Sequence, residues 1–319
     1  MTLLGQTPGT SKLARPVAPN IFRIPTGISN AYFVILSTGD YVLVDAGGTG
    51  YGKKILQAAL DLFDSATPAA ILLTHAHFDH AGGLPELLQY WPEIPIYAHA
   101  LELPYLNSTV RYPPGDATVG GAMAEMSRFL DTARPTPLPV PAQPFPDETT
   151  ELDMMPGWHL RPSPGHTPGH VSFWNDADRI LLAGDAIVTL DSNNPTHLIT
   201  RRPKISGPPP YATYNWNHAR QSARALAELG PLYLCTGHGP EDSGEHLVED
   251  LRRFAAHFPV PKRGRYVRSP ARFNREGPTF VPPPVSDYMK YAFLTAAAVL
   301  LGAGIYAVAR QRRQRKPSL

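Results

Sequence analysis

The sequence Thr74-His75-Ala76-His77-Phe78-Asp79-His80 directly follows the apolar stretch Ala69–Leu73 and places four potential metal ligands at the end of a predicted buried strand. Side chains two residues apart point the same way along an extended backbone, so His75 and His77 can bind one cation together. Asp79 and His80 follow at the turn into the next predicted helix, where they can face a second cation. This stretch therefore predicts a metal site.

The chemistry of these side chains narrows the choice of metal. Imidazole and carboxylate ligands without thiolate suit zinc, iron or manganese, and an open coordination position is typical of a catalytic site. The single cysteine, Cys235, excludes a structural cage of several thiolates. The simpler interpretation is a histidine-rich surface loop, and three later segments argue against it.

Each of these three segments brings a further ligand-type residue to the end of a strand or the tip of a loop. Glycines and prolines force Ser163-Pro164-Gly165-His166-Thr167-Pro168-Gly169-His170 into a tight loop with a histidine at its tip. The apolar run Ile180–Ala183 leads to Asp185, and the run Leu232–Thr236 leads to His238 between two glycines. Each signal is weak alone, but their order after the first histidine cluster makes the set specific.

With these motifs the chain resembles the metallo-β-lactamase superfamily over about residues 20 to 257. The resemblance implies two metal ions, one held by His75, His77 and His166, the other by Asp79, His80 and His238, with Asp185 bridging them. It also implies that Asp45 lies behind the ligands and orients them by hydrogen bonds. The alternative for Asp45 is an aspartate that only starts a turn. His170 is a second candidate for such a supporting position.

Short β-rich segments alternate with helical patterns in both halves of the chain. In the first half we expect strands at Ile21–Ile24, Ala31–Leu36, Tyr41–Val44, Ala69–Leu73 and Ile94–Tyr97, and helices near Lys53–Leu62 and Leu84–Tyr90. In the second half we expect strands near Leu160, Val171–Trp174, Ile180–Ala183 and Leu232–Thr236, and helices at Trp216–Leu229 and Glu245–His257. This alternation predicts an α/β (α+β layered) sandwich. The resemblance implies its αββα form, with the metals at one edge.

Composition is consistent with one catalytic domain, which we assign to residues 1–257. A chain of 319 residues with 43% hydrophobic content can bury a large single core. The formal net charge of +2 gives no electrostatic footprint for a nucleic-acid partner. One cysteine suits a reducing compartment, and no signal peptide is recognisable before Asn20. We therefore expect the catalytic domain to be cytoplasmic.

The C-terminal part differs in composition. Tyr291–Ala309 contains no charged residue and is close to the length of a bilayer-spanning helix. Basic residues follow it at Arg310, Arg312, Arg313, Arg315 and Lys316. We expect a Pro/Arg-rich linker at 258–287, a transmembrane helix at 288–309 and a basic tail at 310–319, which make a single-pass membrane protein with membrane lipid as a partner. The alternative is a buried or amphipathic terminal helix.

The segment 104–156 interrupts the regular pattern. Prolines cluster at 134–141 and glycines at 120–121, so regular structure cannot extend throughout. Because the segment lies between the second and third ligand groups of the sequence, one hypothesis is a flap that shapes the substrate site. The other hypothesis is an inert surface excursion.

The predicted site indicates hydrolysis. Two divalent metals can lower the pKa of a shared water and polarise a bond, so we predict a dinuclear hydrolase that uses a metal-bound hydroxide. Its small-molecule substrate would contain an ester, thioester, lactone or related bond, and Zn(2+) would be the metal, two per chain, with iron or manganese as alternatives. Asp79 and Asp185 are the catalytic candidates, because these carboxylates could also accept or relay a proton.

Further features bear on the substrate. The sequence is similar to glyoxalase II-like thioesterases around His75–His80 and His166–His170. Tyr211 and Tyr214 are candidates for donating a hydrogen bond to an oxyanion, as a tyrosine does in lactonases of this fold. The alternative for either tyrosine is packing beneath a loop.

Two other functions were weighed against this hydrolase. A mononuclear iron enzyme resembling persulfide dioxygenases would use His75, His166 and Asp185 as a facial triad, but would leave the other ligand residues unused. A membrane-tethered, non-catalytic binding protein is the second alternative. The complete set of convergent polar groups argues against it, because packing alone would not require them.

Overall fold

The computed structural model describes residues 8–63, 67–146, 151–191, 194–200 and 203–288, together with positions 291, 295, 299–301, 303 and 306. The chain divides into two compact units, Met1–Pro283 and Pro284–Leu319. All described strands belong to the first unit.

The first sheet, within the described residues, has seven strands in sequential order. Its strands are β1 (Arg15–Ala18), β2 (Ile21–Thr26), β3 (Ser29–Ile35), β4 (Tyr41–Val44), β5 (Ile71–Leu72), β6 (Ile96–Ala98) and β7 (Gln143–Pro144). The strands from β1 to β4 are antiparallel, and those from β4 to β7 are parallel. Parallel neighbours end at the same edge, so the residues after β4 and after β5 lie close together.

The second sheet has six strands in the described part of the chain, in the order β13-β12-β11-β10-β9-β8. They are β8 (Glu151–Leu152), β9 (Met155–Pro162), β10 (Val171–Asn175), β11 (Ile180–Gly184), β12 (Tyr233–Thr236) and β13 (Asp242–Ser243). β11 and β12 are parallel, and β9 and β11 are both antiparallel to β10. The C-terminal ends of β9, β11 and β12 therefore lie at one edge of this sheet.

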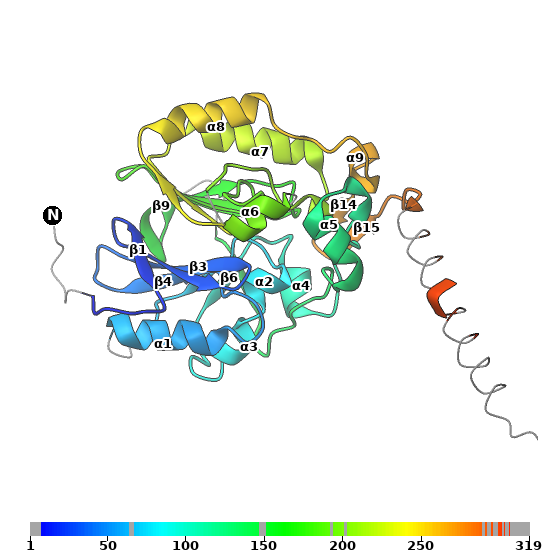
Figure 1. Cartoon of the computed structure of the whole chain (residues 1–319). Coiled ribbons are helices and arrows are strands. Elements are labelled where there is room, and N and C mark those ends of the chain that lie inside the picture. The colour runs from blue at the N-terminus through cyan, green and yellow to red at the C-terminus, as the bar shows by residue number, and fades with distance from the viewer. Residues whose placement is uncertain are drawn as a thin grey trace, which may run out of the picture. The chain divides into compact units, whose positions relative to one another are not determined.

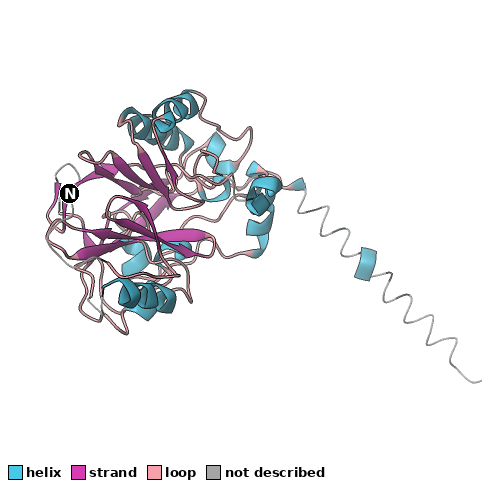
Figure 2. Ribbon diagram, turned by 60° about the vertical axis from the view of Figure 1, so that its left-hand side comes forward, coloured by secondary structure: helices cyan, strands magenta, loops and turns pink. Residues whose placement is uncertain are grey.

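Helices cover the outer face of each sheet. Figure 1 shows α1 (Gly52–Phe63) and α3 (Leu84–Leu87) on one side and α7 (Trp216–Glu228) and α8 (His246–Ala256) on the other. Figure 2 shows the two sheets as layers between these helices. In α1 the buried positions include Ile55, Ala58, Ala59 and Leu62, which form one helical face. The predicted layered α/β sandwich is confirmed.

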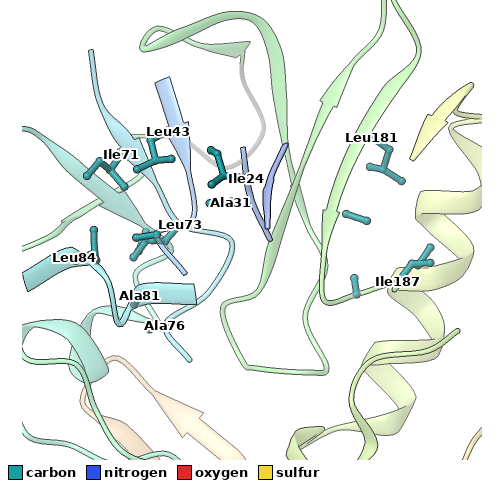
Figure 3. Packing of buried hydrophobic residues seen from close by; sticks show 14 of the residues in the cluster. Ile24, Ala31, Leu43, Ile71, Leu73, Ala76, Ala81, Leu84, Leu181 and Ile187 are labelled. Atoms are coloured by element: carbon teal, nitrogen blue, oxygen red, sulfur yellow. The ribbon is translucent and has the colours of Figure 1, made fainter. Parts of the chain in front are cut away.

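Alternation along the strands builds the core on both faces of each sheet. On β4, Val42 and Val44 pack between the two sheets, whereas Leu43 packs toward the helices. Figure 3 shows Leu43 beside Ile71, with Leu84 of α3 nearby. Burying each such aliphatic side chain stabilises the fold by about 1.5–3 kcal/mol.

The segment 104–156 contains only short helices and strands among its described residues, apart from the start of β9, as its composition predicts. Its helices are α4 (Leu103–Asn107), η1 (Ala117–Val119), α5 (Ala122–Met126) and η2 (Ser127–Phe129). Other short helices among the described residues include α2 (Phe78–Ala81), α6 (Pro195–Thr200) and η3 (Pro210–Ala212). Asp116 fixes part of the segment, because its carboxylate accepts hydrogen bonds from Thr118 N at 3.0 Å and Arg265 N at 2.6 Å.

The beginning of the predicted linker 258–287 is folded. It contains α9 (Arg265–Arg268) and the hairpin of β14 (Arg272–Asn274) and β15 (Gly277–Phe280). Tyr266 is buried, and its hydroxyl donates to Pro114 O at 2.6 Å, which joins this part to the segment 104–156. The domain boundaries drawn from the sequence stay a prediction.

The C-terminal helix requires a correction. Among the described positions of the chain, no helix combines the length and the apolar character that a membrane crossing requires. The predicted transmembrane helix at 288–309 and the single-pass membrane localisation are therefore wrong, and membrane lipid has no support as a partner. The uncharged composition suggested a span, but a span also needs about 20 consecutive helical residues. Many positions of 288–309 and the basic tail 310–319 lie outside the described residues.

Candidate metal centre

The first histidine cluster begins where β5 ends. His75, His77, Asp79 and His80 are all buried. The carbonyl oxygen of His77 accepts hydrogen bonds from His80 N and Ala81 N, both at 2.9 Å, and so starts the short helix α2. This turn separates the two pairs of side chains. His75 and His77 belong to the extended part, whereas Asp79 and His80 belong to the helix.

Three further side chains come from the edge of the second sheet. His166 lies in the loop between β9 and β10, Asp185 follows β11, and His238 follows β12. Gly237 makes this arrangement possible, because a Cβ atom at that position would lie 2.0 Å from Asp185 Oδ1.

The structure brings all seven predicted ligand residues together around Asp185. Asp185 Oδ2 lies 2.9 Å from His238 Nε2 and 3.4 Å from His166 Nε2, and Asp185 Oδ1 lies 3.5 Å from His80 Nε2. His77 Nδ1 lies 2.9 Å from His166 Nε2. Three overlapping groups each have their ligand atoms within 4.8 Å of one another, namely His75, His77 and His166; His75, His80 and Asp185; and Asp79, His80 and His238.

Several polar atoms of this cluster make no hydrogen bond. Within the described part of the chain, His75 Nε2, His80 Nε2 and Asp185 Oδ1 are buried without a hydrogen bond. Leaving one such atom unsatisfied costs about 1–3 kcal/mol, so three together indicate a missing partner. Imidazole and carboxylate atoms that converge in this way fit a divalent cation.

The electrostatics of the cluster favour the forms that bind metal. Burial lowers the pKa of His75 and His166 well below its usual value and that of His77 to about 4, so these imidazoles are neutral at pH 7. Burial acts to raise the pKa of Asp185, but His238 and His80 more than offset this effect, so that the carboxylate is ionised. A cation would find its ligands already deprotonated at these positions.

His80 differs from the other histidines. Burial acts to lower its pKa, but the carboxylates of Asp185, Asp45 and Asp79 together raise it to about 10. A proton therefore occupies His80 in the metal-free protein at neutral pH. A cation bound there would displace this proton and take over its role of balancing the carboxylate charge.

Asp45 lies directly behind His80. Its Oδ2 atom is 2.8 Å from His80 Nδ1, and its Oδ1 atom accepts a hydrogen bond from Thr74 N at 2.8 Å. The backbone of Asp45 has a φ of 58°, in the left-handed region that non-glycine residues rarely adopt. The contacts fix the ring so that its Nε2 atom faces the cluster.

His170 supports Asp185 from another side. Its Nε2 atom accepts a hydrogen bond from the backbone N–H of Asp185 at 2.9 Å, and its Nδ1 atom lies 2.9 Å from Ser163 Oγ. Burial lowers the pKa of His170 to about 3, so the ring is neutral and can accept this bond. It holds the backbone of one candidate ligand, and its ring lies 5.1 Å from the ring of another, His75.

The two predicted substrate tyrosines occupy different positions. Tyr211 lines a small cavity together with His77, Asp79, His166, Asp185 and His238, and also lines a neighbouring cavity of about 350 Å³. Burial raises the pKa of Tyr211, so its hydroxyl stays protonated. Tyr214 instead lies behind His77, with its hydroxyl 3.4 Å from His77 Nε2.

The sequence analysis missed Glu102 and Tyr112. Glu102 is fully buried, and its carboxylate accepts hydrogen bonds from Ala76 N at 3.0 Å, from Gly169 N at 2.8 Å and from the Tyr112 hydroxyl. Ala76 and Gly169 belong to the two loops that carry the histidines. The only sequence signal is a single acidic residue within the largely apolar run 100–106.

Comparison with known proteins agrees with this architecture. A family model described as the metallo-beta-lactamase superfamily matches residues 24–238. The layered fold and the cluster of histidines and aspartates define a metallo-hydrolase, and the chain belongs to the metallo-beta-lactamase superfamily. The predicted family and the predicted enzyme class are confirmed. This superfamily binds divalent metals, and the described residues contain candidate sites for them.

Individual relatives are similar over much of the chain. The probable metallo-hydrolase YflN of Bacillus subtilis is 33% identical over 242 residues, which cover 75% of this chain and 90% of YflN. A hydroxyacylglutathione hydrolase of Xanthomonas euvesicatoria is 29% identical over 157 residues, which cover 49% of this chain and 46% of that protein. Among solved structures, the BLEG-1 B3 metallo-beta-lactamase has a similar fold, with a TM-score of 0.52, 24% identity and coverage of 76% and 100% of the two chains.

Proposed function

We propose that this protein is a dinuclear metal-dependent hydrolase of small molecules with an ester, thioester, lactone or related bond. The observation that carries the proposal is the convergence of buried ligand atoms around Asp185, three of which make no hydrogen bond. His75, His77 and His166 would hold one cation, and Asp79, His80 and His238 would hold the other. Asp185 would contact both, because its carboxylate lies 3.4 Å from His166 Nε2 of the first group and 2.9 Å from His238 Nε2 of the second.

Zinc is the cation that we assign to both positions, with iron or manganese as alternatives, because the ligands are imidazoles and carboxylates. A pair of divalent cations supplies an activated water at neutral pH and polarises the bond under attack. Asp185 would orient the histidines through its two oxygens. Asp79 and Asp185 both line the small cavity, so we assign the proton-accepting role to these two carboxylates.

The substrate would enter through the cavity of about 350 Å³, which shares Pro209, Tyr211 and His238 with the small cavity. Apolar side chains such as Ile28, Met123 and Val188 line much of it. These contacts support a substrate with an apolar group next to the scissile bond. The protonated hydroxyl of Tyr211 would donate to the developing oxyanion. The similarity to hydroxyacylglutathione hydrolases supports thioesters as a first substrate class to test.

The mononuclear iron alternative is less well supported. It would use His75, His166 and Asp185, and it gives no role to the group formed by Asp79, His80 and His238. We therefore retain the dinuclear hydrolase.

The test measures bound metal by plasma mass spectrometry in protein purified without chelators, and hydrolysis of generic ester, thioester and lactone substrates in parallel. We expect about two zinc ions per chain and hydrolysis that a chelator abolishes and zinc restores. One iron per chain with oxygen-dependent turnover would replace the proposal by the dioxygenase. Absence of both bound metal and turnover would refute it.

A further inference from the structure

Glu102 links two loops that are far apart in the sequence. Its Oε2 atom accepts a hydrogen bond from Ala76 N at 3.0 Å, between His75 and His77. Its Oε1 atom accepts from Gly169 N at 2.8 Å, in the loop that carries His166. One carboxylate therefore fixes the distance between the two loops whose histidines form the first ligand group.

Tyr112 joins this arrangement from the segment 104–156. Its hydroxyl donates to Glu102 Oε2, and its ring lies 4.6 Å from the ring of His77. The same ring stacks on Tyr105 at 3.6 Å and faces Tyr214 at 5.9 Å. Tyr112, Tyr105 and Tyr214 thus form an aromatic wall beside His77, and the hydrogen bond to Glu102 ties this wall to the loop that carries His77.

The close packing around Glu102 leaves little room for adjustment. A Cβ atom at Gly169 would lie 2.9 Å from Glu102 Cγ and 2.5 Å from His99 Nδ1, so the loop approaches the carboxylate as closely as glycine permits. All three donors to Glu102 lie in or directly behind the histidine loops. In contrast, the second ligand group is held elsewhere, since His80 contacts Asp45 and His238 Nδ1 lies 2.7 Å from Ile28 O.

We propose that Glu102, with Tyr112 as its partner, is a positioning residue for the cation bound by His75, His77 and His166. This inference rests on the proposed function, because it concerns one of the two cations. It predicts a selective effect. Loss of the carboxylate weakens the binding of this cation and leaves the binding of the cation at Asp79, His80 and His238 nearly unchanged. It also gives the segment 104–156 a role in supporting the site from behind.

The decisive variant is Glu102→Gln. The amide has one acceptor oxygen and one donor nitrogen, but both carboxylate oxygens accept hydrogen bonds in the native protein. The amide nitrogen must therefore face the backbone N–H of either Ala76 or Gly169. Mutation of a residue that supports a metal ligand typically lowers the metal affinity by about 10–100-fold. We therefore expect Glu102→Gln to lower the affinity for one of the two zinc ions by at least about tenfold.

Glu86→Gln is the matched control. Glu86 in α3 also joins two backbone positions, with Oε1 accepting from Gly50 N at 2.8 Å and Oε2 from Lys53 N at 3.4 Å. Neither position belongs to a histidine loop. We expect this variant to bind both zinc equivalents as the wild type does.

The experiment uses the full chain and combines zinc competition against a chromophoric chelator, the cobalt(II) absorption spectrum and thermal unfolding with and without zinc. A positioning role predicts that one of the two zinc ions binds more weakly and that the cobalt spectrum changes. It also predicts a smaller zinc-induced rise of the unfolding midpoint. A purely structural role predicts a lower midpoint in the metal-free protein with unchanged zinc affinity, and that result would overturn the inference.

A second variant covers the case in which Glu102→Gln does not fold. Tyr112→Phe removes one donor but keeps the carboxylate and the ring, and we expect the same equivalent to weaken by a few fold. Wild-type affinity for both equivalents in Tyr112→Phe would then refute the inference. Failure of the proposed function is seen separately, as wild-type and Glu86→Gln proteins that bind zinc without hydrolysing any substrate.

Discussion

The two candidate ligand groups are held in place by different means. In the group of Asp79, His80 and His238, hydrogen bonds act directly on the rings, because His80 Nδ1 contacts Asp45 and His238 Nδ1 contacts Ile28 O. In the group of His75, His77 and His166, the rings contact the hydroxyls of Thr74, Tyr214 and Thr213, and further support comes through loop backbone bound to Glu102 and through the ring of Tyr112 beside His77.

This difference would allow the fold to adjust the two ligand groups in part separately. A change to Asp45 acts on the ring of His80 and, through Thr74 Oγ1, on His75, whereas a change to Glu102 acts on the spacing of two loops. Asp185 lies within 3.5 Å of histidines of both groups. Variants can therefore be ranked by whether they affect both groups or one.

The largest effect is expected for Asp185→Asn, which removes the central negative charge. Because both groups lose a ligand atom, we expect both zinc equivalents to weaken and kcat to fall by more than about 100-fold, the upper range for a merely supporting residue. Metal content and steady-state kinetics measure this. Asp61→Asn is the control, since the Asp61 carboxylate accepts hydrogen bonds from Ser11 and Gln57, which lie outside the cluster. Retention of both metals in Asp185→Asn would contradict the bridging role.

Tyr211→Phe tests the cavity that the two groups share. Removing an oxyanion donor lowers kcat by roughly 10²–10³-fold, and Phe keeps the ring that lines the cavity. We expect a loss of about 100-fold in kcat with little change in KM or in bound zinc. Tyr90→Phe, at a half-exposed tyrosine outside the cluster, should leave kcat unchanged. An equal loss of zinc in Tyr211→Phe would instead indicate a ligand-supporting role.

Asp45→Asn sharpens the comparison between the groups. The amide keeps only one acceptor, although Asp45 accepts from both Thr74 N and Thr74 Oγ1 and also contacts His80. We expect about 10–100-fold weaker binding of the zinc at Asp79, His80 and His238, and a smaller loss at His75, His77 and His166, because Thr74 Oγ1 joins Asp45 to His75 Nδ1. Zinc competition measures both, with Asp40→Asn as the control. If Asp45→Asn and Glu102→Gln weaken binding of the same zinc ion more strongly, the separate support of the two groups is wrong.

The sequence predicts the ligands well because each lies at the end of an apolar strand or in a short loop rich in glycine and proline. The runs before Asp45 and Asp185 appear as β4 and β11, whose alternation and length are local properties. Glu102 has no such local signal, because its partners Ala76 and Gly169 lie 26 and 67 residues away. Its role follows from tertiary contacts only.

The composition of the C-terminal part did not predict its structure correctly. The absence of charge in 291–309 suggested a membrane span, but charge pattern alone does not establish a continuous helix of sufficient length. Prolines and arginines predict a linker at 258–287, and within this range the Tyr266 hydroxyl donates to Pro114 O and Ala271 N donates to Tyr214 O at 3.1 Å. Such backbone contacts do not depend on apolar periodicity, so the sequence pattern does not reveal them.

The smallest effect is expected for Tyr214→Phe. The hydroxyl of Tyr214 lies 3.4 Å from His77 Nε2, so its loss removes one long hydrogen bond behind the ring and leaves the aromatic wall intact. A hydrogen bond contributes about 0.5–1.5 kcal/mol, which corresponds to about two- to tenfold weaker zinc binding at His75, His77 and His166. Zinc competition and kcat measure this change.

Tyr266→Phe is the matched control for that variant. Its ring lies 5.2 Å from the ring of Tyr214, and its hydroxyl also makes one buried hydrogen bond, but to Pro114 O rather than to a candidate ligand. Both variants lose a buried hydroxyl, so they should lower the unfolding midpoint of the metal-free protein by similar amounts. Only Tyr214→Phe should weaken zinc binding. Equal zinc affinities in the two variants would mean that the aromatic wall supports His77 by packing alone, without a contribution from this hydroxyl.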